Sequence, residues 1–305
     1  MRTAALVNFF NVPMIVPTAG GDNIFPSNNL WAFRLSAPGS QYANYLFGSL
    51  LENINAVADE DVAFSPKLRI AILYEQNTFG ESAAVATARA AMQQGTEIGV
   101  YESFPQKYAD PALLNRLIHK VRDAGDIHLV VLVSSEPATA ITLTQLFHNQ
   151  TDYDQMPVLI GQAGGFASQE FIDSESADDI YIIHQQVILK DCPSGIESLF
   201  EAQTYAAAHL LNLTMEQIKE IRPEKNWYEI TNQEEVDISF VRENLRDAIK
   251  LFDGELPCVG QVSFDNRGQN KDIQFDLIFL DHGEMNIGPT EEFISSLKSK
   301  MDPFQ

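Results

Sequence analysis

The sequence predicts an α/β fold in which helices cover both faces of a parallel sheet. The first observation is an alternation of short apolar runs and helical stretches through the middle of the chain. The second is that most runs are continuously apolar, as parallel strands buried on both faces are. The third is that the runs end in small polar residues or glycine. The predicted strands are Leu68–Tyr74, Glu97–Phe104, Ile127–Val133, Pro157–Gly161 and Ile180–Ile183.

Helices are predicted between these strands. The stretch Phe79–Gln94 is rich in alanine and suits packing against a sheet. Asp110-Pro111 and Glu136-Pro137 each offer proline as a first helical residue, and Asp110 is also a good cap. A further helix is predicted over Gly165–Ile172. The helix after Asp110 has one apolar face, which consists of Leu113, Leu114, Leu117, Ile118 and Val121.

The N-terminal part is predicted to precede this repeat as a smaller set of elements. We expect a helix end at Ala4–Phe10 and short strands at Pro13–Val16 and Trp31–Leu35. Ser40–Asn53 has the apolar spacing of a helix. The polar and acidic stretch Asn55–Pro66 is interpreted as a surface loop.

The first residues share features with a signal peptide: an early basic residue, an apolar stretch and then small residues. Asn8, Asn11 and Pro13 interrupt the apolar stretch, which favours the helix-and-strand interpretation. No stretch approaches the ~20 apolar residues that a membrane span needs.

After Gln185 the pattern changes. Ser194–Leu213 and Phe240–Phe252 are predicted helices, and Ile221–Asp237 is a polar, irregular segment. Gly260–Phe264 and Asp272–Leu280 flank a turn-rich stretch, and the second of them alternates with a period close to two. We therefore expect these two segments to form an antiparallel pair.

Composition excludes some classes of function. The chain has 305 residues, enough for one large or two medium domains. Its net charge of −22, without clusters of Lys and Arg, argues against a nucleic-acid partner. The charge is that of a solvated acidic surface; the alternative is attraction for a cationic ligand.

No catalytic or metal-binding motif stands out. The chain contains no GxSxG, P-loop or GxGxxG motif, and its six histidines lack metal-ligand spacing. We therefore expect no enzyme activity, no metal and no cofactor. The two cysteines, Cys192 and Cys258, either pair or remain thiols, and their spacing does not decide between these.

The carboxyl ends of the predicted strands indicate a binding site. In an open α/β sheet, ligands lie outside the carboxyl ends of the strands. The segments at these ends are Glu75–Gly80, Ser134–Glu136 and Gln162–Gly165. They can form hydrogen bonds but hold no obvious pair of nucleophile and base. The pattern therefore favours binding over catalysis.

Several short stretches occur in an order and spacing that extend over nearly the whole chain. They are Val12–Thr18, Phe33–Ser36, Ile70–Tyr74, Phe79–Glu81, Tyr101–Phe104, Tyr205–Ala207 and Gly260–Gly268. In this order they resemble the type 1 periplasmic binding proteins, in particular the leucine/isoleucine/valine-binding family of ABC-transporter receptors. No single stretch is specific; their order carries the resemblance.

The resemblance implies two α/β lobes joined by three crossovers, with a ligand held in the cleft between them. The crossovers would lie near Leu35–Ser36, His184–Val187 and Val262–Phe264. Lobe one would comprise residues 1–35 and 185–261, and lobe two residues 36–184 and 262–305. Lobe one would be incomplete, because the family has further strand–helix units there. The chain would then be a fragment, a product of a wrongly assigned start, or a member whose first half lies on another polypeptide.

The resemblance also implies positions that contact a ligand. The family's serine or threonine that holds a ligand carboxylate aligns with Gly20, and Thr18 or backbone N–H groups would substitute for it. The family's tyrosine aligns with Phe79, and an acidic residue that pairs with the ligand amine aligns with Ala163. Leucine-like specificity is therefore not implied. The expected ligand contacts are Thr18, Ala19, Gly20, Phe79, Ser134, Ser135, Gln162 and Gly164.

Each lobe-two position has a structural alternative. Phe79 would pack on the ligand or within the core, and Ser134 and Ser135 would bind the ligand or cap a helix. Gly164 and Gly165 would line the site or form a turn. His184, at a strand end, is interpreted as structural.

The expected function is a solute-binding or ligand-sensing domain for a small polar, amino-acid-like metabolite. Its partners would be the ligand and an ABC transporter permease or a sensor module, in the periplasm or outside the cell. The alternatives are a degenerate module that only mediates protein contacts and an enzyme on a similar frame.

Overall fold

The computed structural model describes residues 2–52, 67–106, 110–150, 156–162, 164–186, 192–196, 198–221, 238–281, 284–287 and 290–301. The expected loop Asn55–Pro66, the position Ala163 and nearly all of Ile221–Asp237 lie outside these residues. The chain divides into two units. Unit 1 consists of Met1–Ala37 and Gln185–Gln274, and unit 2 of Pro38–His184 and Phe275–Gln305.

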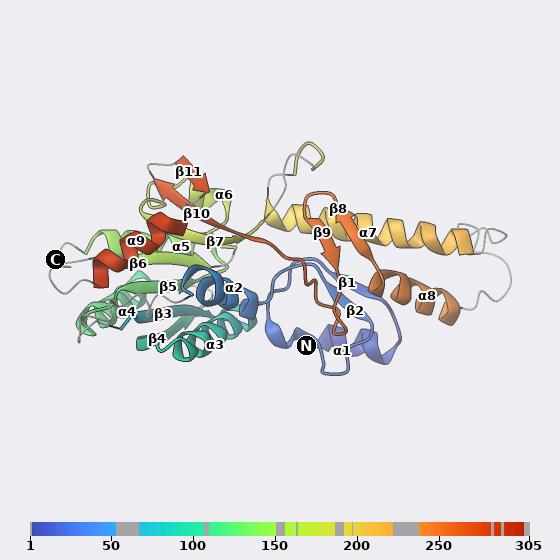
Figure 1. Ribbon diagram of the computed structural model, residues 1–305, viewed down its shortest axis with the longest axis horizontal. Helices are drawn as coiled ribbons and strands as arrows, with labels where there is room; N and C mark the ends of the chain where they lie inside the picture. Colours follow the sequence, from blue (N-terminus) through green and yellow to red (C-terminus); the bar gives the residue numbers. More distant parts are fainter. Residues whose placement is uncertain are drawn as a thin grey trace. The chain divides into compact units, whose positions relative to one another are not determined.

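The central element of unit 2 is a seven-stranded sheet with the order β11-β10-β7-β6-β5-β3-β4 (Figure 1). Its strands are β3 (Arg69–Gln76), β4 (Glu97–Pro105), β5 (Leu129–Val133), β6 (Val158–Gln162), β7 (Ile180–Gln185), β10 (Phe275–Asp281) and β11 (Glu284–Ile287). Strands β3 to β7 pair in parallel, which confirms the parallel sheet that the sequence predicts. Strands β10 and β11 pair antiparallel to each other.

Helices lie on both faces of this sheet. They are α2 (Gly39–Tyr45), the π-helical turn η2 (Leu46–Leu50), α3 (Thr78–Gln93), α4 (Pro111–Asp123), α5 (Pro137–His148), α6 (Gln169–Ile172) and α9 (Thr290–Met301). One core cluster joins alternate residues of the strands, such as Leu73 and Leu132, to Leu117 of α4 and Phe147 of α5. On the other face, Tyr181 of β7 packs on Phe293 of α9. The burial of both faces explains why these strands are continuously apolar.

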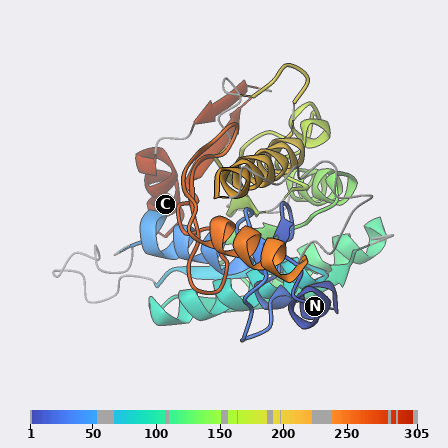
Figure 2. The same ribbon diagram turned by 90° about the vertical axis from the view of Figure 1, so that its right-hand side faces the viewer.

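Unit 1 is built from smaller sheets and longer helices. Its elements are α1 (Arg2–Phe9), β1 (Met14–Val16), η1 (Asp22–Ile24), β2 (Ala32–Arg34), α7 (Leu199–Ile221), α8 (Ile238–Lys250), β8 (Asp253–Leu256) and β9 (Gly260–Ser263). Strands β1 and β2 pair in parallel, and β8 and β9 pair antiparallel. Figure 2 shows α7 and α8 side by side, and their apolar faces share a core with Phe33 and Leu35.

The expected antiparallel pairing of Gly260–Phe264 with Asp272–Leu280 is wrong. Strand β9 pairs with β8 in unit 1, whereas β10 joins the large sheet of unit 2. Within the described residues, the two segments are connected only by one isolated antiparallel bridge, between Phe264 and Asn270. The chain passes from one unit to the other between Gln274 and Phe275, so the two strands belong to different cores.

The boundaries between the units fall after Ala37, before Gln185 and after Gln274. The first two lie within two residues of the positions expected from the sequence. The third differs, since the expected division followed Gln261. Residues up to Asn270 stay with unit 1 because Phe264 packs on Phe33, and Gln269 bridges to Arg34.

All three crossovers meet at Gln185 and Gln186. The Gln185 Oε1 accepts hydrogen bonds from the Ala37 N–H and from Nε2 of Gln203, at 2.9 Å each. The Gln186 N–H donates to the Gln274 carbonyl at 2.9 Å. The second crossover is thereby tied to the first and to the third.

The pairing of the two cysteines, which the sequence leaves open, is decided by the structure. Cys192 and Cys258 form a disulfide that spans 66 residues of sequence. Cys258 lies in the turn between β8 and β9, and the bond joins this turn to the segment ahead of α7.

Candidate ligand-binding site

The carboxyl edge of the unit 2 sheet brings three of the predicted segments together. Strands β6, β5 and β3 are neighbours, and their register places Tyr74, Val133 and Gln162 in one row. The residues that follow this row are Glu75, Ser134 and Ser135, with Gly164 close behind Gln162. This is the edge at which open α/β sheets hold their ligands.

Glu75 is fully buried at the end of β3, and its two carboxylate oxygens differ. Oε2 accepts hydrogen bonds from the N–H and the hydroxyl of Ser135, at 2.6 Å each. Oε1 has no partner in the part of the chain that the structure describes. Burial raises the pKa of Glu75 above its ordinary value and the charge of Glu136 adds to this shift, whereas hydrogen bonds from Ser135 and Asn77 oppose it. Ser135 therefore holds the carboxylate firmly at Oε2.

Gln162 ends β6 and is also fully buried. Its backbone carbonyl accepts a 3.4 Å hydrogen bond from the Ser134 N–H. Neither its side-chain oxygen nor its side-chain nitrogen has a partner among the described residues. Leaving a buried polar group unpaired costs about 1–3 kcal/mol, so such a group needs an explanation.

The two serines are engaged with the protein itself. The Ser134 hydroxyl is within 3.2–3.3 Å of the backbone carbonyl and N–H of Glu136, at the start of α5. This is the helix-start alternative that the sequence left open. The Ser135 hydroxyl donates to Glu75 and accepts from Asn77 Nδ2 at 3.1 Å. Ser135 thereby positions the carboxylate and remains only half-buried itself.

Phe79 and Gly164 lie at the same edge and are partly exposed. The Phe79 ring packs edge-on against Tyr42 of α2, with ring centroids 5.6 Å apart, so one side of it belongs to the unit 2 packing. Gly164 lies in a turn, and the Gly165 N–H that follows donates to the Ser134 carbonyl at 3.1 Å. A Cβ at Gly165 would lie 2.7 Å from that carbonyl oxygen, so this turn requires glycine.

The start of α3 fixes the position of Glu75. Asn77 caps the helix by accepting a 2.7 Å hydrogen bond from the Gly80 N–H. A Cβ at Gly80 would lie 2.1 Å from the Glu75 carbonyl oxygen. The tight turn between β3 and α3 therefore depends on glycine and sets the direction in which Glu75 leaves the strand.

Sequence reasoning named the segment Glu75–Gly80 but did not select Glu75 as a site residue. The available signal was a carboxylate that directly follows an apolar strand, without a basic residue beside it in the sequence. Glu75 and Asn77 are therefore added to the candidate site.

The remaining predicted residues, Thr18, Ala19 and Gly20, form a loop after β1 in unit 1. Thr18 is exposed, and the Ala19 carbonyl accepts from Arg34 Nη1 at 3.0 Å and from the Ser36 hydroxyl at 3.1 Å. Arg34 also donates to the Gly21 carbonyl at 2.6 Å. Burial lowers the pKa of Arg34 to about 10, so it remains charged at neutral pH. This buried cation holds the loop in place.

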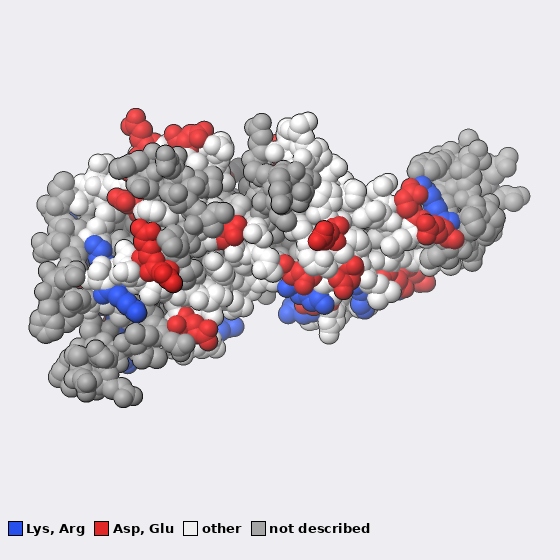
Figure 3. All heavy atoms as spheres, turned by 45° about the horizontal axis from the view of Figure 1, so that its top comes forward, with Lys and Arg blue, Asp and Glu red and all other residues white. Residues whose placement is uncertain are grey.

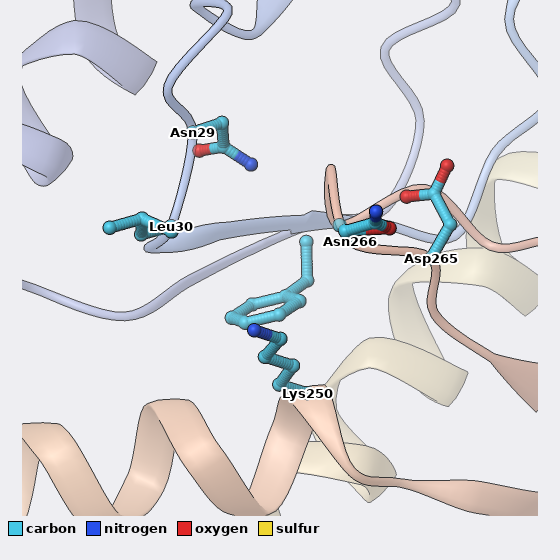
Figure 4. A pocket seen from close by; sticks show the side chains of 7 residues that line it. Asn29, Leu30, Lys250, Asp265 and Asn266 are labelled. Atoms are coloured by element: carbon cyan, nitrogen blue, oxygen red, sulfur yellow. The ribbon is translucent and has the colours of Figure 1, made fainter.

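Unit 1 also contains an open pocket with about 200 Å³ of empty space (Figure 4). Figure 4 shows Lys250 extending from α8 toward a lining that includes Asn29, Leu30, Asp265 and Asn266. Asn29 is already bonded to Ala32 and to the Arg267 carbonyl. One carboxylate oxygen of Asp265 accepts from the N–H groups of Arg267 and Gln269. Because these groups are already paired, the pocket is a weaker candidate than the sheet edge.

The distribution of charged side chains, the search for metal ligands and the search for membrane spans do not indicate another location for the site. On the face that Figure 3 shows, acidic side chains are scattered over both units. The described residues contain no group of three or more His, Cys, Asp or Glu that could hold a metal ion. None of the described helices is both long and apolar enough to cross a membrane.

Comparisons with known proteins define the fold. No family model matches the chain, and no curated protein matches it. Solved structures do match: an ABC transporter substrate-binding protein from Desulfitobacterium hafniense in complex with Leu has a TM-score of 0.63 at 15% identity, over 93% of this chain and 76% of that one. The chain therefore has the type 1 periplasmic-binding-protein fold.

Two further structures support this assignment. An extracellular ligand-binding receptor from Rhodopseudomonas palustris HaA2 has a TM-score of 0.68 at 12% identity, over 94% of this chain and 78% of that one. A solute binding protein of an ABC transporter from Rhodopseudomonas palustris BisB5, in complex with 3,4-dihydroxy benzoic acid, has a TM-score of 0.66 at 15% identity, over 93% and 72%. This chain spans about three quarters of the length of each of these structures.

Proposed function

We propose that this protein is a solute-binding or ligand-sensing protein that holds a small polar metabolite at the carboxyl edge of the unit 2 sheet. One observation carries the proposal: two fully buried side chains at that edge, Glu75 and Gln162, have polar atoms without a partner among the described residues. A bound ligand would supply those partners. The solved structures that share the fold and are named as substrate-binding proteins support the same role.

The mechanism we propose is ligand-dependent closure of the two units about the crossovers. A ligand bound between the lobes stabilises the closed state only by its higher affinity for that state. The loop Thr18–Gly20 of unit 1, which Arg34 holds, is the segment to which the resemblance assigns ligand contacts there. The bonds of Gln185 and Gln186 would keep the three crossovers together as a hinge.

The location we propose is the periplasm or the cell exterior. The Cys192–Cys258 disulfide supports this, because disulfides persist in oxidising compartments and are rare in the cytosol of mesophiles. The partner would be an ABC transporter permease or a sensor module. No enzyme activity is proposed, and no nucleic-acid partner.

A thermal-shift screen of the whole chain against small metabolites tests the function. A solute-binding protein should show ligands that raise the melting temperature with saturation, since binding only to the folded state stabilises it. Free leucine, isoleucine and valine should bind weakly, because Gly20 and Ala163 align with polar residues of the family that this chain resembles. If no metabolite shifts the melt, the alternative of a module that only mediates protein contacts is favoured.

A further inference from the structure

We propose that the open pocket of unit 1 is a second binding site, which takes a small monocarboxylate with an apolar substituent (Figure 4). The carboxylate pairs with Lys250 and Asn266, and the substituent lies on Leu30 and Phe33. This inference goes beyond the proposed function, because the whole lining of the pocket belongs to unit 1 and the metabolite of the proposed function is held by unit 2.

Lys250 gives the pocket a positive charge that no described carboxylate balances. It is the last residue of α8 and is exposed, and Figure 4 shows its side chain extending toward the rest of the lining. None of the described ion pairs involves Lys250. A ligand carboxylate supplies the charged acceptor that this ammonium group lacks.

Asp265, the acidic residue of the lining, already interacts with the protein itself. Its Oδ1 accepts hydrogen bonds from the N–H groups of Arg267 and Gln269, at 2.8 and 2.9 Å. Burial lowers the pKa of Arg34, and the charge of Asp265 is one of those that oppose this shift, so the two groups attract each other. The lining therefore combines a balanced carboxylate with an unbalanced ammonium group, which favours an anionic ligand over a cationic one.

The other lining groups select a carboxylate that carries an apolar substituent. The exposed Asn266 side chain forms no hydrogen bond with the described residues, so its two N–H donors are available to a carboxylate oxygen. Leu30 and Phe33 form the apolar part of the lining, and Leu30 is 56% exposed. They offer no donor to the additional oxygens of a phosphate or a sulfate.

The walls of the pocket are held in place without a ligand. The Asn29 Nδ2 donates to the Ala32 carbonyl at 2.7 Å and to the Arg267 carbonyl at 2.8 Å. These bonds join the segment that carries Leu30 to the turn that carries Asn266, and a preformed site loses less entropy on binding. The empty space of about 200 Å³ is less than the about 300–1,000 Å³ of drug-sized sites, so the ligand has few atoms.

NMR titration of the whole chain with butyrate and butyramide, which differ in charge and have nearly the same shape, tests the proposal. Butyrate should shift the backbone amide signals of Leu30, Asn266 and Gly268. It should bind about 2- to 5-fold tighter than butyramide, which is the effect of a solvent-exposed ion pair. Acetate should bind more weakly than butyrate, by up to about 4-fold for each methylene that butyrate buries.

Three variants separate the charge of Lys250 from the charge of the whole chain. Lys250→Met keeps the length of the side chain and should lower butyrate binding to the level of butyramide. Lys271→Met removes the same charge from an exposed position of unit 1 outside the pocket and should bind butyrate as the parent does. Asp265→Asn keeps the Oδ1 acceptor, removes the opposing charge and should tighten butyrate binding. Circular dichroism confirms that each variant is folded.

The inference is overturned if butyrate binds no tighter than butyramide, if Lys250→Met binds butyrate as the parent does, or if butyrate leaves the signals of the pocket unchanged. Shifts confined to Ser134 and Gln162 would also overturn it, because the carboxylate would then belong to the unit 2 sheet. The thermal-shift screen tests the proposed function separately. A metabolite that stabilises Lys250→Met as it stabilises the parent supports that function, whatever the titration shows for the pocket.

Discussion

Gln162 combines complete burial with an amide that no described residue pairs, so its side chain opposes folding of the free protein. Replacing it with methionine, which has a similar length and no donor or acceptor that needs pairing, removes that cost. Gln162→Met should therefore raise the free energy of unfolding by about 1–3 kcal/mol without ligand. Urea unfolding followed by circular dichroism measures this difference.

Gln203 is the control for this substitution. It is also buried, and its Nε2 donates to Gln185 at 2.9 Å, whereas its Oε1 has no partner among the described residues. Gln203→Met removes one hydrogen bond together with one unpaired oxygen, so it should raise the free energy of unfolding less than Gln162→Met does. If Gln162→Met is less stable than the parent, Gln162 has a partner in the folded protein and the site argument fails.

Glu75 should make stability depend on pH in a direction opposite to most carboxylates. Its folded pKa is raised above the ordinary 4.5, mainly by burial. The folded state then binds the proton more tightly than the unfolded state, so the contribution of Glu75 to stability is fully present below pH 4.5 and is lost as pH rises through the folded pKa.

Glu75→Gln removes this titration. The difference in unfolding free energy, variant minus parent, should increase as pH is raised from about 4 to 8, and urea unfolding at each pH measures it. Glu170→Gln, at an exposed position in the first turn of α6, is the control. A difference that stays constant with pH would show that Glu75 ionises in the folded protein as it does in the unfolded chain.

At the residue scale the sequence predicts where the site lies better than what each residue does. Strand ends follow from the apolar pattern, so the pattern by itself places Ser134, Ser135 and Gln162 at one edge of the sheet. Side-chain partners depend on rotamers and on neighbouring strands, which a one-dimensional pattern does not contain. For this reason the sequence does not single out Glu75, and it does not reveal the bonds of Ser135 to Glu75 and Asn77.

At the scale of elements, the repeated strands are predicted to within about two residues, because each is a short apolar run bounded by turn residues. The predicted pairing of Gly260–Phe264 with Asp272–Leu280 is wrong. Both segments have strand patterns and flank a turn, which is also what a local hairpin has. Contacts between residues that are distant in sequence, such as Phe264 with Phe33, decide which core each strand joins.

The turn between β3 and α3 gives a test at this scale. Gly80→Ala would place a Cβ about 2.1 Å from the Glu75 carbonyl oxygen, a backbone atom that cannot rotate away. The variant should lose about 1–3 kcal/mol of stability, as overpacked sites do, and should weaken binding of any ligand found in the screen. Urea unfolding and calorimetry measure the two effects.

Gly48 provides the matched substitution, since a Cβ there meets nothing within 4 Å. It lies in the helical turn η2, where alanine is favoured over glycine by up to about 1 kcal/mol. Gly48→Ala should be neutral or stabilising and should bind ligand normally. Equal effects of the two alanine variants would mean that the β3–α3 turn is not as tight as the structure has it.

At the scale of the molecule, the two units have separate cores and different means of stabilisation. Unit 2 has the large sheet, whereas unit 1 has small sheets joined to long helices and carries the disulfide. Trp31 is buried in unit 1, where Arg246 lies over its ring, and the described part of unit 2 contains no tryptophan. Tryptophan fluorescence therefore follows unit 1 selectively, whereas circular dichroism follows both units.

The disulfide should stabilise unit 1 and leave unit 2 nearly unchanged. It closes a loop of 66 residues, which restricts the unfolded chain and is worth about 4 kcal/mol in the chain-entropy model. Reduction, or the double variant Cys192→Ala with Cys258→Ala, should move the fluorescence transition to lower urea concentration. The part of the circular dichroism signal that comes from unit 2 should change at the same urea concentration as before, because neither cysteine belongs to that unit.

A thiol assay confirms reduction, and a fluorescence midpoint that does not move in fully reduced protein would contradict the prediction. Equal displacement of both transitions would instead show that the two units unfold as one cooperative body.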